Sequence, residues 1–269
     1  MADLIKWDVS GERMFELGVD HVVLYPLNET KAKSSNSADV KTQYGPGVAW
    51  NGITSISESP EGGDANDLWA DNIKYASLRA TETFGASIEA YMYPDEFAVL
   101  DGSASLADGV YAGQQKRGKF GLCYRTRVGD DTKDEAGYKY HLIYGCSVTP
   151  SEKSYETVND SPDAITFSWD MDTTPVTIDL PDGAPEALKS LKPTSVVIID
   201  STKLDGGENN AKLKTLLSKL YGTAAVAAVP ASGNNPAVAA VAAVDAYLPL
   251  PGEVFEIMYT APAQQGSGG

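Results

Sequence analysis

Few side chains in this sequence could carry out catalysis or bind a metal. The chain has 2 histidines, His21 and His141, and 2 cysteines, Cys123 and Cys146. Histidine is the most common acid–base catalyst and metal ligand, so this scarcity matters. No GxSxG, P-loop, HExxH or GxGxxG motif occurs, and the cysteines lack the CxxC spacing of a zinc site. We therefore expect no catalytic, cofactor-binding or metal-binding residues.

Two groups of aspartates are the remaining chemical candidates. The acidic segment 58–72 holds three of them: Asp64, Asp67 and Asp71. Their spacing differs from the D-x-[DN]-x-[DN]-G pattern of a calcium loop, so calcium binding is the weaker interpretation. A second group could supply the paired carboxylates of a glycosidase: Asp163, Asp170 and Asp172. Two of these fall on the polar face of one predicted strand, which favours a solvated face over a hydrolase site.

The composition is typical of a soluble, acidic globular protein. The 269 residues include 21 basic and 37 acidic side chains, which give a formal net charge of −16. Such a surface repels the phosphates of nucleic acids and disfavours docking on anionic membranes. The sequence has no run of about 18 apolar residues that could span a bilayer, and its first residues lack the apolar core of a signal peptide. We expect a protein made in the cytosol, folded as one large domain or two small ones.

Alternating apolar residues predict β-strands through much of the chain. The strongest pair is 119–128 and 138–148, joined by the polar segment 129–137, which indicates a long hairpin. Shorter strands are predicted at 19–24, 48–57, 165–171, 195–200 and 254–259. Helices are predicted at 94–100 and at 210–221, where leucines recur at helical spacing before Gly222. The predicted fold class is mainly β, a sandwich or barrel with one or two short α-helices.

The remaining segments define the predicted domain organisation. Residues 1–222 form the main β domain, in which 28–47 is a polar loop and 58–72 is a long loop. Loops of this length are uncommon unless they are functional or disordered. Residues 223–247, rich in alanine and valine, form an insertion or arm that is partly helical at 237–244. Residues 248–260 supply a closing strand of the main domain, and 261–269 form a disordered tail.

The alternation also places the two thiols and one histidine. Cys123 lies on the polar face of its strand together with Arg125 and Arg127, and His141 falls on the same polar face of the hairpin. Cys146 lies on the aromatic face of the next strand, so a register that matches the apolar faces keeps the thiols on opposite sides of the sheet. We therefore expect two buried free cysteines and no disulfide.

Charge is distributed unevenly along the chain. No basic residue occurs between residues 42 and 73, whereas five basic residues cluster around the predicted hairpin: Lys116, Arg117, Lys119, Arg125 and Arg127. Head-to-tail self-assembly needs two complementary patches of this kind on one chain. A solvated acidic protein is the simpler alternative.

Six stretches carry a resemblance to a known family. They are residues 44–63 (YGPGVAWNGITSISESPEGG), 69–75 (WADNIKY), 89–97 (EAYMYPDEF), 120–126 (FGLCYRT), 141–145 (HLIYG) and 198–203 (IIDSTK). With the leucine-rich helix up to Gly222, they resemble the major tail tube proteins of long, non-contractile-tailed, siphovirus-like bacteriophages. The resemblance covers roughly residues 11–221 and 248–258. It departs from the family at residues 223–247, which are longer than the usual link.

The resemblance implies a structural virion protein without catalytic residues. Six copies would close a ring, sheets of neighbouring subunits would form a continuous inner barrel, and rings would stack into the tail tube that conducts DNA. The implied partners are further copies of the chain, the tape-measure protein, the tail terminator, distal tail or baseplate proteins and a tail assembly chaperone. DNA would pass through the lumen without specific binding, no membrane would be involved, and assembly would take place in the host bacterial cytoplasm.

The long loop and the basic patch then become the expected assembly interface. The residues that we place in it are Glu58, Glu61, Asp64, Trp69, Asp71, Arg125 and Arg127. An adhesive or carbohydrate-binding β-sandwich domain is the alternative function, and exposed aromatic platforms would distinguish it.

Overall fold

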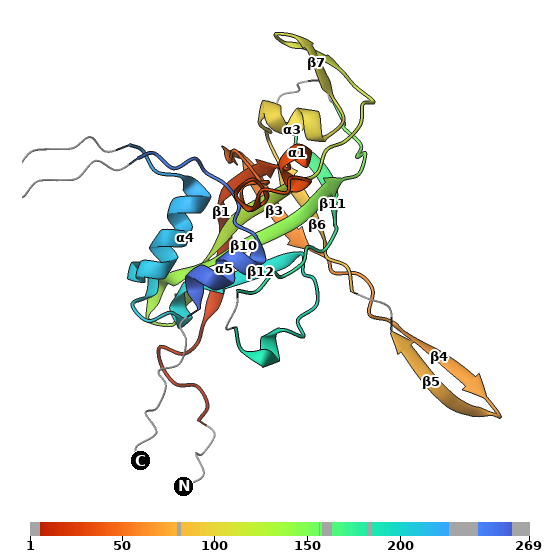
Figure 1. Ribbon diagram of the computed structural model, residues 1–269, viewed down its shortest axis with the longest axis vertical. Helices are drawn as coiled ribbons and strands as arrows, with labels where there is room; N and C mark the ends of the chain where they lie inside the picture. The colour runs from red at the N-terminus through yellow and green to blue at the C-terminus, as the bar shows by residue number, and fades with distance from the viewer. Residues whose placement is uncertain are drawn as a thin grey trace, which may run out of the picture.

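The computed structural model describes residues 6–79, 82–155, 157, 163–181, 184–225 and 242–259. Its centre is an 8-stranded antiparallel sheet in the order β2-β1-β9-β10-β11-β6-β3, with β12 also paired to β10 (Figure 1). The strands are β1 Phe15–Pro26, β2 Val48–Ala49, β3 Ile53–Glu58, β6 Gly85–Ala90, β9 Phe120–Asp130, β10 Lys133–Val148, β11 Phe167–Thr173 and β12 Val196–Asp200. The predicted mainly β class is confirmed.

Two hairpins and several short helices complete the chain. The hairpins are β4 Ala65–Ala70 with β5 Ile73–Arg79, and β7 Ala104–Ala107 with β8 Val110–Ala112. The α-helices are α1 Glu29–Ala32, α2 Ser37–Lys41, α3 Asp95–Leu100, α4 Ala211–Tyr221 and α5 Pro251–Met258. Three single-turn 3₁₀ helices lie at η1 Glu186–Leu188, η2 Ser201–Lys203 and η3 Gly207–Asn209.

Residues 120–124 and 140–146 of the central hairpin β9–β10 contribute to two cores, one on each face. On one face, Phe120 and Leu122 contribute to a first core with Trp50, Phe97 and Trp169. The Phe97 ring of α3 lies 4.2 Å from that of Trp50 and 5.0 Å from that of Trp169, between ring centroids, so α3 closes this core. Because β1 also contacts β3, the path from β2 to β3 curls round these aromatic side chains, and we call this part of the sheet the barrel.

The second core lies between the other face of β9–β10 and the helices α4 and α5. Leu213, Leu216 and Leu220 of α4 are fully buried there. Two buried tyrosines of the sheet also bond the helical layer: the Tyr25 hydroxyl donates to the Leu220 carbonyl at 2.7 Å, and that of Tyr144 donates to the Pro249 carbonyl at 2.8 Å. Burial of apolar leucines and satisfied phenols together fix α4 and α5 on the sheet.

A β-bulge at Gly145 lets β10 serve both cores. The register with β9 shifts between Ile143 and Cys146, and Gly145 has a φ of +63°, a left-handed conformation that favours glycine. Before the bulge Tyr140 and Tyr144 face the second core, whereas after it Cys146 faces the first. The prediction that residues 138–148 keep one uninterrupted apolar face is therefore wrong.

The bulge and the register also decide where the thiols and His141 lie. Cys123 belongs to the second core and Cys146 to the first, and both are free, which confirms the prediction of two buried, separated thiols. Burial raises the pKa of Cys123 to about 12 and also raises that of Cys146. His141 pairs with Tyr124 rather than with Arg125, so its predicted place on the arginine face is wrong: Leu142, not His141, lies beside Cys123.

Helix and strand predictions had mixed outcomes. The helices at 94–100 and 210–221 are confirmed as α3 and α4, and the strands at 19–24, 165–171 and 195–200 as β1, β11 and β12. The predicted 48–57 strand is broken into β2 and β3, and the predicted loop 28–47 holds α1 and α2. The predicted closing strand at 254–259 is wrong, because this segment lies in α5, where Pro251 stands in the first turn and starts the helix.

The predicted long loop at 58–72 is also wrong, because half of it is strand. Ala70 pairs with Ile73, and the two residues between them, Asp71 and Asn72, have φ of 50° and 63°. Positive φ at both central positions makes a type I′ turn, which favours Asp and Asn. The Asp108–Gly109 turn that joins β7 to β8 also has a residue with positive φ, since the φ of Gly109 is 75°.

The alanine- and valine-rich stretch is described only at its ends. Thr223 and Val244 form an isolated antiparallel bridge that brings these ends together. Residues 226–241 lie outside the described residues, and so does most of the helix predicted at 237–244; its described residues, 242–244, are not helical. The tail predicted to be disordered, 261–269, lies outside the described residues as well.

The bulge predicts a large loss of stability for Gly145→Ala. A Cβ atom there would lie 2.2 Å from the Thr174 carbonyl oxygen, so a collision adds to the strain of positive φ, and we expect a loss of about 3 kcal/mol or more. Gly109→Ala is the matched control, because its φ is +75° but nothing lies within 4 Å of the added atom, and it should cost only about 1 kcal/mol. Urea unfolding of both variants measures this, and equal losses would contradict the role of the bulge.

Candidate assembly interface

The hairpin β4–β5 projects from the body of the protein (Figure 1). Together with its root we call it the arm, which comprises the described residues 59–79 and 82–84. One face is polar: the Lys74 ammonium lies 2.7 Å from the Asp67 carboxylate, and the Ser77 hydroxyl donates to the same oxygen at 2.8 Å. The other face presents Leu68 and Leu78 to solvent. An isolated two-stranded hairpin is marginal in water at best, so an apolar face on such an element calls for a covering partner.

The tip of the arm carries large exposed side chains. Trp69 is 68 % exposed and Tyr75 is 74 % exposed, and Ile73 at the turn is exposed too. Scattered exposed hydrophobic residues are ordinary on protein surfaces, but contiguous ones on a projecting element mark interaction sites. The arm is therefore the first candidate contact surface.

Glu58, the last residue of β3, ties the arm to the barrel. Its Oε1 accepts a hydrogen bond from the Tyr124 hydroxyl and lies 3.2 Å from His141 Nδ1. The Tyr124 and His141 rings stack with their centroids 4.6 Å apart. The contact with His141, helped by the hydrogen bond from Tyr124, lowers the pKa of Glu58 although burial opposes this. The root of the arm is thus held by both strands of the central hairpin.

The four strands β1, β9, β10 and β12 form a sheet with two open edges. Among the described residues, β12 pairs only with β10, and β1 before Val22 pairs only with β9. Ile198 in β12 is 51 % exposed. Unpaired strand edges are templates for pairing with another chain. The two edges lie on opposite sides of the sheet, so one copy could present each edge to a different neighbour.

A polar row crosses the face of this sheet that lies opposite α4 and α5. The Thr126 hydroxyl donates to Glu16 at 3.2 Å, and Lys139 forms an ion pair with the same glutamate. Lys139 in turn pairs in register with Asp200 of β12. This row, with Glu58 beyond it, holds three carboxylates and one ammonium, so the exposed face is acidic.

Arg125, which we predicted to lie in the assembly interface, is engaged by side chains of its own chain. Its guanidinium forms a bidentate pair with Asp20, at 2.5 and 3.3 Å, and stacks on the Tyr138 ring with its Cζ 3.9 Å from the ring centroid. The pair with Asp20 neutralises the charge within the chain. Arg127, two residues on, is exposed and borders a shallow pocket with Leu17 and Tyr138.

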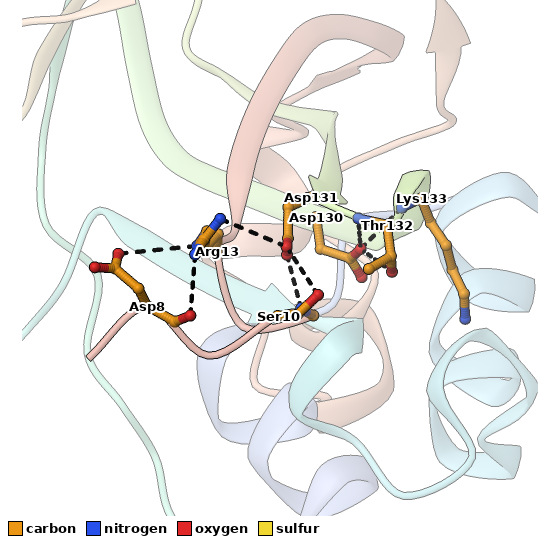
Figure 2. Close-up of polar contacts among 8 residues, drawn as sticks. Asp8, Ser10, Arg13, Asp130, Asp131, Thr132 and Lys133 are labelled. Atoms are coloured by element: carbon orange, nitrogen blue, oxygen red, sulfur yellow. Dashed lines mark hydrogen bonds and ion pairs between the residues drawn. The ribbon is translucent and has the colours of Figure 1, made fainter. Parts of the chain in front are cut away.

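The N-terminal segment is fastened to the β9–β10 turn (Figure 2). Asp131 accepts hydrogen bonds from the Gly11 amide at 2.7 Å and the Ser10 hydroxyl at 3.1 Å, and Arg13 lies 3.9 Å from the same carboxylate. These contacts, led by the Gly11 amide, lower the pKa of Asp131. The segment therefore leaves the body beside the hairpin turn, with Trp7 exposed.

A second projecting hairpin, β7–β8, follows α3 on another side of the body (Figure 1). Leu106 near its turn is 70 % exposed, and Val110 and Tyr111 are exposed as well. Like the arm, this hairpin makes its own small sheet rather than joining the central one. It is a second candidate contact surface that sequence reasoning missed, although its Asp-Gly turn is a strong hairpin signal.

The residues that we predicted for the interface are not brought together at one place. Trp69 and Asp71 lie at the tip of the arm, and Asp64 directly precedes β4. Glu61 lies in the root, where its backbone pairs with Thr83. Glu58 lies at the barrel, and Arg125 and Arg127 lie on β9. The structure adds three features to the candidate interface: Leu68, Leu78 and the β12 edge. The sequence did not indicate them, because their exposure depends on the fold.

The acidic side chains of residues 58–72 do not come together as a metal site. Asp67 bonds Lys74 and Ser77, and among the residues that the structure describes no group of three or more histidine, cysteine, aspartate or glutamate side chains could hold a metal ion. Asp170 and Asp172 are exposed on β11, as the solvated-face interpretation predicts. None of the described helices is both long and apolar enough to span a membrane.

No protein-family profile matches the chain, and no curated protein sequence matches it. Among solved structures, it is similar to a chain in the cryo-EM structure of the anti-feeding prophage baseplate, a 6-fold symmetrised assembly. The TM-score is 0.32 and the sequence identity 8 %, over 74 % of this chain and 100 % of that one. A likeness at this level assigns neither a family nor a function.

Glu58 predicts a pH-dependent contribution to stability. Because its pKa is lowered in the folded chain, its carboxylate stabilises the fold above the unfolded pKa of about 4.3, and this contribution is lost as the pH falls through the lower folded value. We expect Glu58→Gln to cost roughly 1 kcal/mol at pH 7, a figure reduced for solvent screening, and progressively less as the pH falls below about 4. Urea unfolding across this range measures the difference.

Glu89→Gln is the control for this prediction. Glu89 is exposed on β6 and accepts one hydrogen bond, from the Ser55 hydroxyl at 3.0 Å, so the substitution should change the unfolding free energy by less than about 0.5 kcal/mol at any pH. A Glu58→Gln deficit that stays constant down to pH 3 would show that the carboxylate charge is not what stabilises the root.

Proposed function

We propose that this chain is a structural subunit of a phage tail tube, in which six copies close a ring and rings stack into a conduit for DNA. The observation that carries the proposal is the four-stranded sheet β1–β9–β10–β12 with an open edge on each side. The sequence resemblance over residues 11–221 supplies the family and the number of copies. On this proposal the chain is not an enzyme and acts in the virion tail, after assembly in the bacterial cytoplasm.

The strand directions suit ring closure. Along the sheet, β1 is antiparallel to β9, β9 to β10 and β10 to β12. The β12 edge of one copy can therefore meet the β1 edge of the next in antiparallel pairing, and the order repeats without interruption. A closed ring of this kind leaves no free edge, which removes the hazard of non-specific strand addition.

The two faces of such a ring would differ. Because α4 and α5 cover one face, they would lie outside, and the polar row of Glu16, Lys139 and Asp200 would line the lumen. Its excess of carboxylates repels DNA phosphates, so DNA could slide without binding. The arm would reach a neighbouring subunit or the next ring, where its apolar face would be covered. The tape-measure protein, tail terminator, distal tail or baseplate proteins and an assembly chaperone are the further partners on this proposal.

A second candidate function rests on the tip of the arm. Trp69 and Tyr75 are exposed aromatic side chains, and sugar-binding domains need such platforms. An adhesive or carbohydrate-binding domain would bind on a glycan array through these two residues.

Negative-stain electron microscopy of the purified chain over a concentration series tests the proposal. We expect rings or hollow tubes of uniform bore. A chain that stays monomeric at every concentration and binds glycans through the tip of the arm would instead establish the adhesive function.

The apolar face of the arm predicts that Leu68→Asp prevents tube formation. A charge on this face cannot be buried against a neighbour without a large desolvation penalty, whereas the monomer should lose less than about 0.5 kcal/mol because Leu68 is exposed. Ala65→Asp, on the opposite face of the same hairpin, adds the same charge and should still form tubes. Normal tubes from Leu68→Asp would contradict a role for this face.

The β12 edge makes a separate prediction. The Ser195 carbonyl accepts from the Tyr144 amide at 2.8 Å, so alternate residues 195, 197 and 199 face β10 and the Ile198 amide faces the open edge. Proline is tolerated at such an edge position. Ile198→Pro should therefore reduce ring formation at least about tenfold by removing one or more interchain hydrogen bonds. Ile198→Val keeps the amide and should assemble normally; tubes from both variants would exclude β12 as the joining edge.

A further inference from the structure

A groove of about 990 Å³ lies between the root of the arm and the segment that leads into β12. Phe84 of the root, Pro175 and Pro193 give it an apolar wall. Val196, the first residue of β12, also lines the groove. The groove therefore opens beside the edge through which we propose that copies join, although the strand pairing itself does not use it.

The lining of the groove has an excess of positive charge, in a chain whose formal net charge is −16. Two cations, Arg79 and Lys192, and one acid, Glu82, line it. Among the residues that the structure describes, neither cation forms an ion pair or a side-chain hydrogen bond. An apolar groove with two unpaired cations suits an apolar element that carries a carboxylate.

The tip of the β7–β8 hairpin has this chemistry. Leu106 and Val110 are exposed on either side of the turn that joins the two strands. Asp108 in that turn is exposed as well, and its carboxylate forms no ion pair with any residue that the structure describes. It is also the one charged residue between Ala104 and Ala112. The hairpin therefore presents a single carboxylate among apolar side chains.

The topology brings the hairpin and the groove to the same end of joined sheets. Pro26, the last residue of β1, pairs with Phe120, the first residue of β9, and the hairpin leads into β9 at this end. Antiparallel pairing would set the start of β12 against the later part of β1 in the next copy. The groove would then lie at the end of the sheet from which the neighbour's hairpin projects.

The hairpin does not fill the groove of its own chain. No residue of β7 or β8 lines that groove, and the hairpin and the arm leave the body in different directions (Figure 1). A second copy is therefore the source of a hairpin for the groove. A contact between two different surfaces of one chain is heterologous, so it can repeat from copy to copy.

We propose that the tip of the β7–β8 hairpin of one copy docks into this groove of the next copy. Asp108 would pair with Arg79 and Lys192 across the contact. Leu106 and Val110 would cover the apolar wall. The inference rests on the proposed ring, because the ring is what sets a second copy beside the groove.

Charge reversal tests the contact, with sedimentation velocity and negative-stain microscopy of the full chain. Asp108→Arg should weaken self-association at least about tenfold, because a repulsion replaces a charge-assisted contact. Arg79→Glu with Lys192→Glu should do the same, and all three substitutions in one chain should restore association. Asp170→Arg is the control, on an exposed residue of β11. It should leave association unchanged by itself and should not rescue the two groove substitutions.

The outcomes separate this contact from the proposed tube. Rescue by the combined variant supports the contact, and failure of that rescue overturns it. Normal tubes from Asp108→Arg overturn the contact and leave the tube standing. Weakening by the groove substitutions alone assigns the groove to another occupant, which also overturns the contact. Association that shows the loss and the rescue but forms no rings supports the contact and contradicts the tube. A chain that is monomeric at every concentration overturns both.

Discussion

Strand β10 supplies side chains to both hydrophobic cores, and the rest of the structure depends on how it does so. Its outer side is divided at Gly145: residues 139–143 pair with β12, and residues 146–148 pair with β11. The left-handed glycine turns the strand so that aromatic residues before it face the helices and residues after it face the barrel. Without this change of face, one of the two cores would lose the side chains that β10 supplies.

The same division creates the open edge on which the proposed assembly rests. Because β11 pairs only with the last residues of β10 and leads away into the barrel, β12 can pair with residues 139–143 of β10, and no other described strand pairs with its far side. The arm is similar in principle, since it forms a complete hairpin but leaves its apolar face uncovered. Both features expose groups that the single chain cannot satisfy, and both can be satisfied by further copies.

Much of the sheet could be predicted from sequence, because alternation over β9, β10 and β11 is a local signal. The α4 helix was equally predictable, from the spacing of its leucines and from Gly222 after its last residue. The closing segment could not be predicted in this way. Its eight residues from Pro251 fit the repeat of a helix and that of a strand equally well, and the packing that favours the helix comes from distant parts of the chain. The arm was missed although the Asp71-Asn72 pair suits a type I′ turn; the acidic composition around it looked like a loop.

The interface was harder to predict than the fold because exposure and pairing are set by contacts between distant residues. Arg125 was grouped with the other basic residues around the predicted hairpin, yet its partner Asp20 lies 105 residues away in the chain. Glu58 looked like one acid among many, but Tyr124, 66 residues on, and His141 define its role. Predicting such pairs would have needed the register of β1 against β9, which the bulges in β1 shift.

The burial of both thiols has a practical consequence for following assembly. Cys123 and Cys146 are enclosed in separate cores, and the raised pKa of each keeps it in the unreactive thiol form. A maleimide dye should therefore not label the native, folded chain. A single cysteine introduced on the arm or along β12 would be the one reactive position, so fluorescence transfer between labelled copies could report which surfaces meet without first removing the native cysteines.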